Sequence, residues 1–166
     1  RQQHRVCVAD AGNTRLKLAV FDTEGQRIAA AGWAWDDTQL AAEISSFLAQ
    51  HYPQGAVWVG APRSDLEIKA KKVLEDRSQT VMPRRILSHG PYPTSQLGLD
   101  RLANIEAVLA ERPGGVNLIV SLGTAITLDL LDGRHHRGGL IMPGLTLATR
   151  ALNESAGLPL VDDWRH

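Results

Sequence analysis

The stretch DAGNT, from Asp10 to Thr14, consists of residue types that can grip a phosphate group. It follows the apolar stretch Arg5 to Ala9, and beyond it apolar residues alternate with others, which predicts a strand, a tight turn and a second strand. Such a turn leaves backbone N–H groups accessible, and Gly12 lets a phosphate oxygen approach them without meeting a side chain. Thr14 adds a hydroxyl donor, and Asp10 can hold Mg²⁺ through water because hard cations prefer oxygen ligands. The alternative is an ordinary hairpin turn, in which Asn and Gly are common.

A second turn of small residues lies at Ser121 to Ala125. An apolar strand is predicted before it, from Val116 to Val120, and another after it, from Ala125 to Leu131. Two such turns can hold a polyphosphate from both sides, so the pair is more specific than either turn alone. Neither turn is a Walker loop, since the sequence contains no GxxxxGK[ST] pattern, and it contains no GxGxxG either.

Asp100 and Arg101 are candidates for handling the acceptor of a phosphoryl group. They stand at the start of a predicted helix, in the sequence LGLDR. The Asp100 carboxylate can orient and deprotonate a hydroxyl group, and the Arg101 guanidinium can bind an anionic group. The alternative is that Asp100 stabilises the first helical turn and Arg101 is solvated. Lys17, on the second predicted strand, can reach a phosphate or can be a surface lysine.

An α/β scaffold is predicted to position these residues. A third strand from Arg27 to Trp33 completes an antiparallel meander, after which helices and strands alternate. The expected elements are a helix from the N-cap Thr38 to His51, a strand at Ala56–Val59, a helix around Leu66–Leu74, a strand at Arg84–Leu87 and a helix from about Gly98 to Arg112. Pro113, Gly114 and Gly115 end that helix and predict a domain boundary, with residues 1–112 in a first domain and 113–166 in a second.

The second domain repeats the order of elements that opens the first. Its two strands are followed by a turn at Asp132 and Gly133, and then by a further strand and a helix around the glycine-rich GGLIMPG, Gly138 to Gly144. This weak internal repeat predicts duplicated domains that face one cleft. The second copy is expected to be cut short at His166.

Bulk composition argues against several classes of partner. Eighteen basic and eighteen acidic side chains cancel, so no overall field attracts nucleic acid or an anionic membrane. No apolar stretch approaches the roughly 20 residues that span a bilayer. The one cysteine, Cys7, lies in an apolar run, which predicts a buried core thiol and is compatible with a reducing compartment. Since no charged-then-apolar signal opens the sequence either, the expected location is the cytosol. A small molecule or a nucleotide is the expected ligand.

Four motifs, in this order, resemble those of the type III pantothenate kinases. That family shows DxGNT, GxDR, DxGTAxTxD and GGxIxPG, which stand here at Asp10–Thr14, Gly98–Arg101, Ser121–Asp129 and Gly138–Gly144. The resemblance covers nearly the whole chain and implies duplicated ribonuclease-H-like domains, as in actin-like ATPases and sugar kinases. It also implies a homodimer that phosphorylates pantothenate, the first step of coenzyme A biosynthesis, using ATP, Mg²⁺ and a monovalent cation, K⁺ or NH₄⁺.

The resemblance also implies roles for residues by position. The phosphates of ATP would meet Asp10, Gly12, Asn13, Thr14, Gly123 and Thr124. Lys17 joins this candidate set because of its place on the second predicted strand, and not through the resemblance. Pantothenate would meet Tyr92, Gly98, Leu99, Asp100 and Arg101. Asp100 would be the catalytic base, and Asp10 and Ser121 would lie at the metal site.

The chain departs from the family pattern at three points. Ser121 stands where the family commonly has an aspartate associated with cation binding, so a hydroxyl replaces a carboxylate. Tyr92 and Pro93 are adjacent here, whereas the family spaces the two residue types apart. The family's chain also continues for roughly half a domain. Two other functions stay open: a non-catalytic regulator on the same scaffold, which Ser121 favours, and a kinase of another small alcohol such as a sugar.

Overall fold

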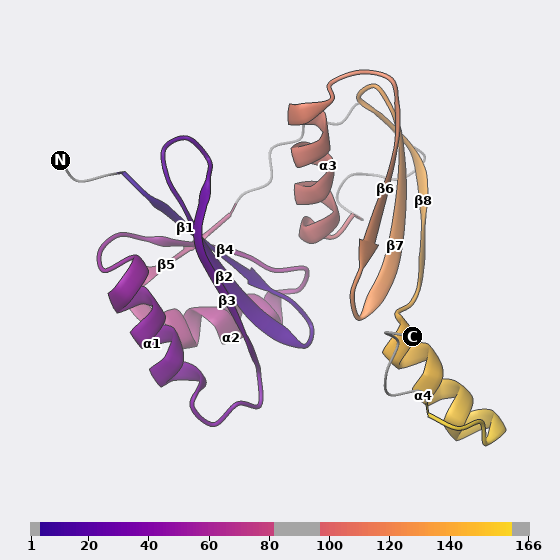
Figure 1. The fold of residues 1–166 in the computed structure, drawn as a ribbon, viewed down its shortest axis with the longest axis horizontal. Coiled ribbons are helices and arrows are strands. Elements are labelled where there is room, and N and C mark those ends of the chain that lie inside the picture. Colours follow the sequence, from indigo (N-terminus) through magenta and orange to yellow (C-terminus); the bar gives the residue numbers. More distant parts are fainter. Residues whose placement is uncertain (1–3, 82–96, 161–166) are drawn as a thin grey trace. The chain divides into compact units, whose positions relative to one another are not determined.

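The computed structural model describes residues 4–81 and 97–160, which divide into two units. The first unit comprises Arg1–Arg84 with Gly98–Asp100, and the second comprises Arg85–Leu97 with Arg101–His166. Figure 1 labels the helices and strands of both units. The domain boundary expected at residues 113–115 stays a prediction.

A five-stranded mixed sheet forms the first unit. The antiparallel meander predicted around DAGNT is confirmed, because β1 (Val6–Ala11) pairs with β2 (Arg15–Phe21) and β2 pairs with β3 (Arg27–Ala34). On the other side of β1, β4 (Val57–Gly60) and β5 (Ser78–Thr80) add as parallel strands, which gives the order β3-β2-β1-β4-β5. Parallel strands joined through helices are typical of an α/β protein, as the sequence predicts.

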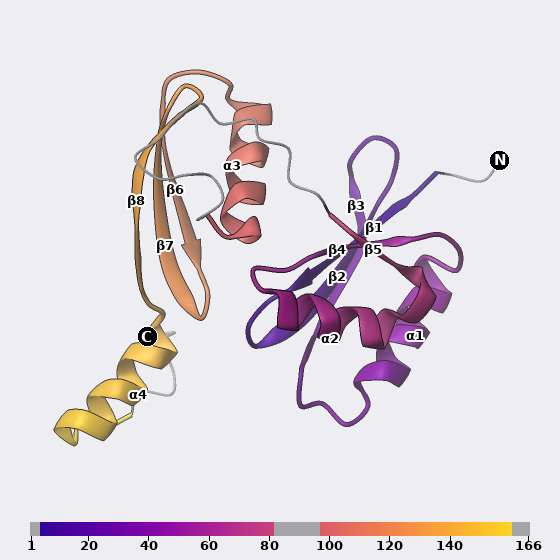
Figure 2. The same ribbon diagram turned by 180° about the vertical axis from the view of Figure 1, so that it is seen from behind.

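Side-chain alternation along β1 and β2 separates a buried face of this sheet from an open one. The buried face carries Cys7, Ala9 and Ala11, which pair in register with Val20, Leu18 and Leu16. Two helices, α1 (Leu40–His51) and α2 (Ser64–Leu74), contact each other and pack on this face (Figure 2). Cys7 is buried there, as predicted, and burial raises the pKa of its thiol to about 11. Asp10 and Lys17 lie on the opposite face, which leaves them open to a ligand.

The start of α1 differs from the prediction. Thr38, the expected N-cap, precedes the helix, which begins at Leu40 with Gln39 in the N-cap position. The carboxylate of Asp37 accepts a hydrogen bond of 2.8 Å from the Gln39 N–H, and its carbonyl accepts one of 3.2 Å from the Leu40 N–H. Asp37 therefore closes a turn ahead of the helix. The assignment of the cap to Thr38 is wrong.

The second unit contains a three-stranded antiparallel sheet and two helices. Its strands are β6 (Val116–Leu122), β7 (Ala125–Asp132) and β8 (His135–Pro143). Its helices are α4 (Leu145–Ala156) and, from Arg101 onward, α3 (Leu99–Glu111). Ile105 and Leu109 of α3 pack with Leu131 of β7 in a core of their own. The order β6-β7-β8-α4 repeats the order β1-β2-β3-α1, as the internal repeat predicts.

The last points concern the chain around β5 and the apolar character of the helices. The strand predicted at Arg84–Leu87 lies outside the described residues, and between α2 and β5 there is in addition a short 3-10 helix, Glu75–Arg77. Across residues 4–81 and 97–160, none of the helices combines the length and the apolar character needed to cross a membrane.

Candidate active site

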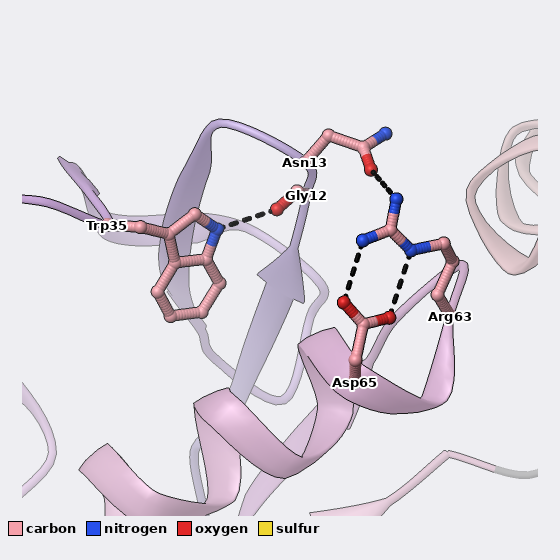
Figure 3. A network of polar contacts seen from close by, with 5 residues as sticks. All are labelled: Gly12, Asn13, Trp35, Arg63 and Asp65. Carbon is pink, nitrogen blue, oxygen red and sulfur yellow. Dashed lines mark hydrogen bonds and ion pairs between the residues drawn. The ribbon is translucent and has the colours of Figure 1, made fainter.

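The first phosphate turn, Gly12 to Thr14, connects the end of β1 to the start of β2. Asn13 and Thr14 are exposed, so a ligand can reach the turn. A β-carbon on Gly12 would lie 3.3 Å from the carbonyl oxygen of Arg15, which is tighter than ordinary van der Waals contact. Trp35, directly after β3, donates from its indole Nε1 to the Gly12 carbonyl oxygen at 2.8 Å (Figure 3). These contacts give the turn a defined shape.

Arg63, which was not among the predicted site residues, lies beside the same turn. Its Nη1 donates to Oδ1 of Asn13 at 3.3 Å, while Nε and Nη2 donate to the Asp65 carboxylate at 2.9 and 2.7 Å (Figure 3). The bidentate pair holds the pKa of the Asp65 carboxyl below its usual value. Arg63 is exposed and therefore places a guanidinium group where an anion can meet it.

The position of Arg63 follows from the pairing of two strands. β1 and β4 are parallel neighbours, and Asp10 stands beside Gly60 at their ends. The segments that follow parallel strands leave the sheet at the same edge, where ligands commonly bind. A basic residue between β4 and α2 therefore indicates an anion site near the DAGNT turn, but only when β1 and β4 are known to be neighbours.

Asp10 and Lys17 are directly opposed in the register of β1 and β2. The Lys17 Nζ lies 3.2 Å from Oδ2 of Asp10, and both side chains are more than half exposed. Within residues 4–81 and 97–160, no group of three or more His, Cys, Asp or Glu residues is arranged to hold a metal ion. Mg²⁺ in phosphoryl-transfer sites needs only one or two carboxylates, with phosphate and water completing its shell. A single open carboxylate at Asp10 fits that requirement.

Asp100 is exposed at the second residue of α3. Its carboxylate lies over Gly98, where a β-carbon would stand 2.5 Å from Oδ1 of Asp100. Leu99 contacts the end of β4, because a β-carbon on Gly60 would lie 3.2 Å from Cδ2 of Leu99. Since Gly60 is beside Asp10 in the sheet, the residues that lead into α3 lie at the same edge of the first unit as the DAGNT turn.

Arg101 is buried in an ion pair with Asp129 of β7. Its Nε donates to Oδ2 of Asp129 at 2.9 Å and its Nη2 donates to Oδ1 at 2.5 Å. The alternative of a solvated Arg101 is therefore wrong. Asp129 is the last residue of the second phosphate motif, so this pair joins two of the four motifs that the sequence analysis recognised separately.

His136 also contacts Asp129, with Nε2 at 2.7 Å from Oδ1. His135 and His136 are neighbours on β8, where His135 is exposed and His136 is buried. Burial alone would raise the pKa of the Asp129 carboxyl. The hydrogen bonds from Arg101 and His136 outweigh burial and hold that pKa below its usual value.

The second phosphate turn, Gly123 and Thr124, connects β6 to β7 and is exposed. Gly144, the last residue of GGLIMPG, packs directly on it and donates its N–H to the Thr124 carbonyl oxygen at 2.9 Å. A β-carbon on Gly144 would overlap the Gly123 carbonyl oxygen and would lie 2.7 Å from that of Thr124. The glycine at this position is therefore required for space.

Ser121 and Tyr92 are the two remaining residues predicted for the site. Ser121 lies on β6 opposite Thr127 of β7, next to the second turn, and offers a hydroxyl group as a ligand. Tyr92, expected to contact the substrate, lies outside the described residues.

Comparison with known proteins identifies relatives over most of the chain. Residues 6–165 match the family model described as type III pantothenate kinase. The chain is 33% identical over 165 residues to the type III pantothenate kinase of Alkalilimnicola ehrlichii, with 92% of this chain and 64% of that protein covered. It spans about three fifths of the length of the curated relatives it matches.

Solved structures agree on the fold. A Campylobacter jejuni protein described as a Baf family transcriptional activator is similar with a TM-score of 0.57 and 19% identity, over 90% of this chain and 60% of that one. The ethanolamine utilization protein EutJ of Carboxydothermus hydrogenoformans is similar with a TM-score of 0.54 and 12% identity, over 96% of this chain and 60% of that one. The chain has the α/β fold of actin-like ATPases and sugar kinases, as predicted.

Proposed function

Because this chain belongs to the type III pantothenate kinase family, we propose that it transfers the γ-phosphoryl group of ATP to the hydroxyl group of pantothenate. The product is 4′-phosphopantothenate, and the reaction is the first step of coenzyme A biosynthesis. The observation that supports this most strongly lies in the first unit. An open glycine turn suited to phosphate and an exposed carboxylate, Asp100, occur at the same edge of one sheet.

Phosphate binding is assigned to the two turns. Backbone N–H groups of Gly12, Asn13 and Thr14 would bind phosphate oxygens at the first turn, and those of Gly123 and Thr124 at the second. The first turn is held by Trp35 and the second by Gly144. Donors held in place before the reaction stabilise developing charge without reorganising. Lys17, paired with Asp10, and Arg63, paired with Asp65, lie beside the first turn and can donate further N–H groups to a phosphate.

Asp100 is assigned as the general base. A carboxylate within hydrogen-bond reach of the acceptor hydroxyl can orient it and accept its proton as the phosphorus–oxygen bond forms. Its exposure at the start of α3 leaves it available to a substrate. Gly98, Leu99 and Arg101 would complete the acceptor site, together with Tyr92. Mg²⁺ bound at Asp10 through water would neutralise charge on the phosphates.

Cation requirement, assembly and location are further parts of the proposal. A monovalent cation, K⁺ or NH₄⁺, would bind near Ser121, with a neutral hydroxyl as its ligand in place of a carboxylate. The protein would act as a homodimer in the cytoplasm. The family membership supports each of these points.

The test is whether pantothenate increases ATP consumption by the full-length protein in the presence of Mg²⁺ and K⁺. We expect a pantothenate-dependent increase, with 4′-phosphopantothenate as a product identified by mass spectrometry. An increase with sugars and none with pantothenate would favour a kinase of another small alcohol. No increase with either would favour a non-catalytic regulator on the same scaffold. This second candidate is favoured by Ser121, which stands where the family commonly has an aspartate.

A further inference from the structure

The guanidinium group of Arg101, on α3, meets two neighbouring strands, β7 and β8. The group lies on Asp129 of β7, and Gly139 of β8 stands beside Asp129 in the sheet register. A β-carbon on Gly139 would lie 2.6 Å from Nη2 of Arg101 and 2.9 Å from Oδ1 of Asp129. The second glycine of GGLIMPG therefore provides the space in which the ion pair is seated.

The geometry of the pair restricts Arg101 strongly. Two parallel N–H···O bonds fix both the plane and the direction of a guanidinium group. Asp129 is itself restrained, because His136 bonds the same oxygen, Oδ1, that Nη2 of Arg101 bonds. The three side chains are almost fully buried. Removal of one partner from such a pair leaves the other charge buried and uncompensated.

Arg101 directly follows Asp100 in the first turn of α3. The ion pair that restrains Arg101 therefore also restrains the orientation of that turn. We propose that Asp129, restrained by His136 and seated by Gly139, is a positioning residue that holds Arg101 and the adjacent α3 start in the orientation that receives the acceptor substrate. This inference rests on the proposed function, which places Asp100 and Arg101 at the acceptor. It assigns Asp129 no contact with ATP, although Asp129 belongs to the same motif as the second phosphate turn.

The test compares two identical substitutions on one hairpin in the full-length protein. Asp129→Asn removes the buried pair between β7 and Arg101 of α3. Asp132→Asn, also on β7, removes the exposed pair between Asp132 and Arg137 of β8. We expect Asp129→Asn to raise the KM for the acceptor roughly tenfold to 100-fold, since small displacements of substrate-positioning groups have effects of that size. The KM for ATP should change less than about twofold, and Asp132→Asn should change neither constant. An unchanged acceptor KM in a folded Asp129→Asn variant would overturn the inference.

A second pair of variants covers the case in which Asp129→Asn does not fold. Arg101→Gln leaves the Asp129 carboxylate with His136 as its partner. The double variant with Asp129→Asn places neutral amides at both positions, which can form an amide–amide hydrogen bond. If Asp129 acts only through Arg101, the double variant should show the same acceptor KM as Arg101→Gln alone. A further rise of about tenfold in the double variant would overturn the inference, because Asp129 would then act independently of Arg101.

Failure of the inference can be told apart from failure of the proposed function. Wild-type turnover with pantothenate tests the function alone. If the wild type uses another alcohol, the function is wrong, and the same ratios measured with that alcohol still decide the role of Asp129. If the wild type uses no acceptor, both proposals fall.

Discussion

The indole N–H of Trp35 donates a 2.8 Å hydrogen bond to the carbonyl oxygen of Gly12, across 23 residues of sequence. The backbone N–H of Trp35 also donates to the carbonyl oxygen of Thr14 at 3.4 Å. Two carbonyl groups of the DAGNT turn thereby accept hydrogen bonds from Trp35, at the end of β3. Since carbonyl oxygens repel phosphate oxygens and N–H groups attract them, this arrangement favours an anion at the turn.

Trp35→Phe tests whether that hydrogen bond shapes the phosphate site. The variant keeps an aromatic ring and loses the donor, so the free energy of unfolding should fall by about 1 kcal/mol. The KM for ATP should rise about fivefold, because the turn loses its restraint. Steady-state kinetics and urea unfolding measure the two effects. Trp58→Phe on β4, where the side chain is 44% exposed, is the matched control and should leave both values nearly unchanged.

Gly144→Ala tests the contact between GGLIMPG and the second turn. A methyl group at this position would overlap the Gly123 carbonyl oxygen. Overpacking of this kind should lower the free energy of unfolding by about 1–3 kcal/mol and weaken ATP binding by displacing the turn. Gly114→Ala makes the same chemical change where no atom lies within 4 Å, and should be nearly neutral. Equal behaviour of the two variants in thermal unfolding and in ATP titrations would contradict the assignment.

Asp100→Asn tests the general base. The side chain is exposed and the substitution keeps its size, so the melting temperature should not change. Loss of the base should lower kcat by about 10²–10⁴-fold. Glu111→Gln, an exposed residue at the other end of α3, is the control and should retain full turnover. A wild-type rate for Asp100→Asn in the full-length protein would show that another group accepts the proton.

Acid titration tests the charge of the Asp129 site. The folded pKa of the Asp129 carboxyl lies below its ordinary value of 3.8, so its ion pair stabilises the protein fully above pH 3.8. This stabilisation is lost as the pH falls from 3.8 through the lower folded pKa. Chemical unfolding measured at several pH values should therefore show a shallower acid loss for Asp129→Asn than for wild type. Asp132→Asn should change the slope less, because its pair with Arg137 is exposed and screened.

Local patterns in the sequence determined the elements and the turns. Alternation of apolar residues along Leu16, Leu18 and Val20 depends only on the two-residue period of a strand, and these three side chains are buried on one face as expected. The small residues of both turns predicted their place between antiparallel strands, which the register confirms. The repeated order of strands and helix was visible for the same reason. The prediction of Thr38 as the N-cap was wrong, because the neighbouring Asp37 also has a side-chain oxygen that can accept from a backbone N–H. Asp37 makes that hydrogen bond and closes the turn ahead of α1.

Only the tertiary structure decided which of these pieces meet. Arg63 reaches Asn13 across 50 residues because β1 and β4 are parallel neighbours, and no local pattern states that pairing. Arg101 reaches Asp129 across 28 residues because α3 packs against β7 through Ile105 and Leu109, and Gly139 leaves space for the ion pair. Residue type told us that Arg101 could bind an anion. Its partner within the chain depends on strand register and helix packing, which are set by burial of apolar surface over the whole unit.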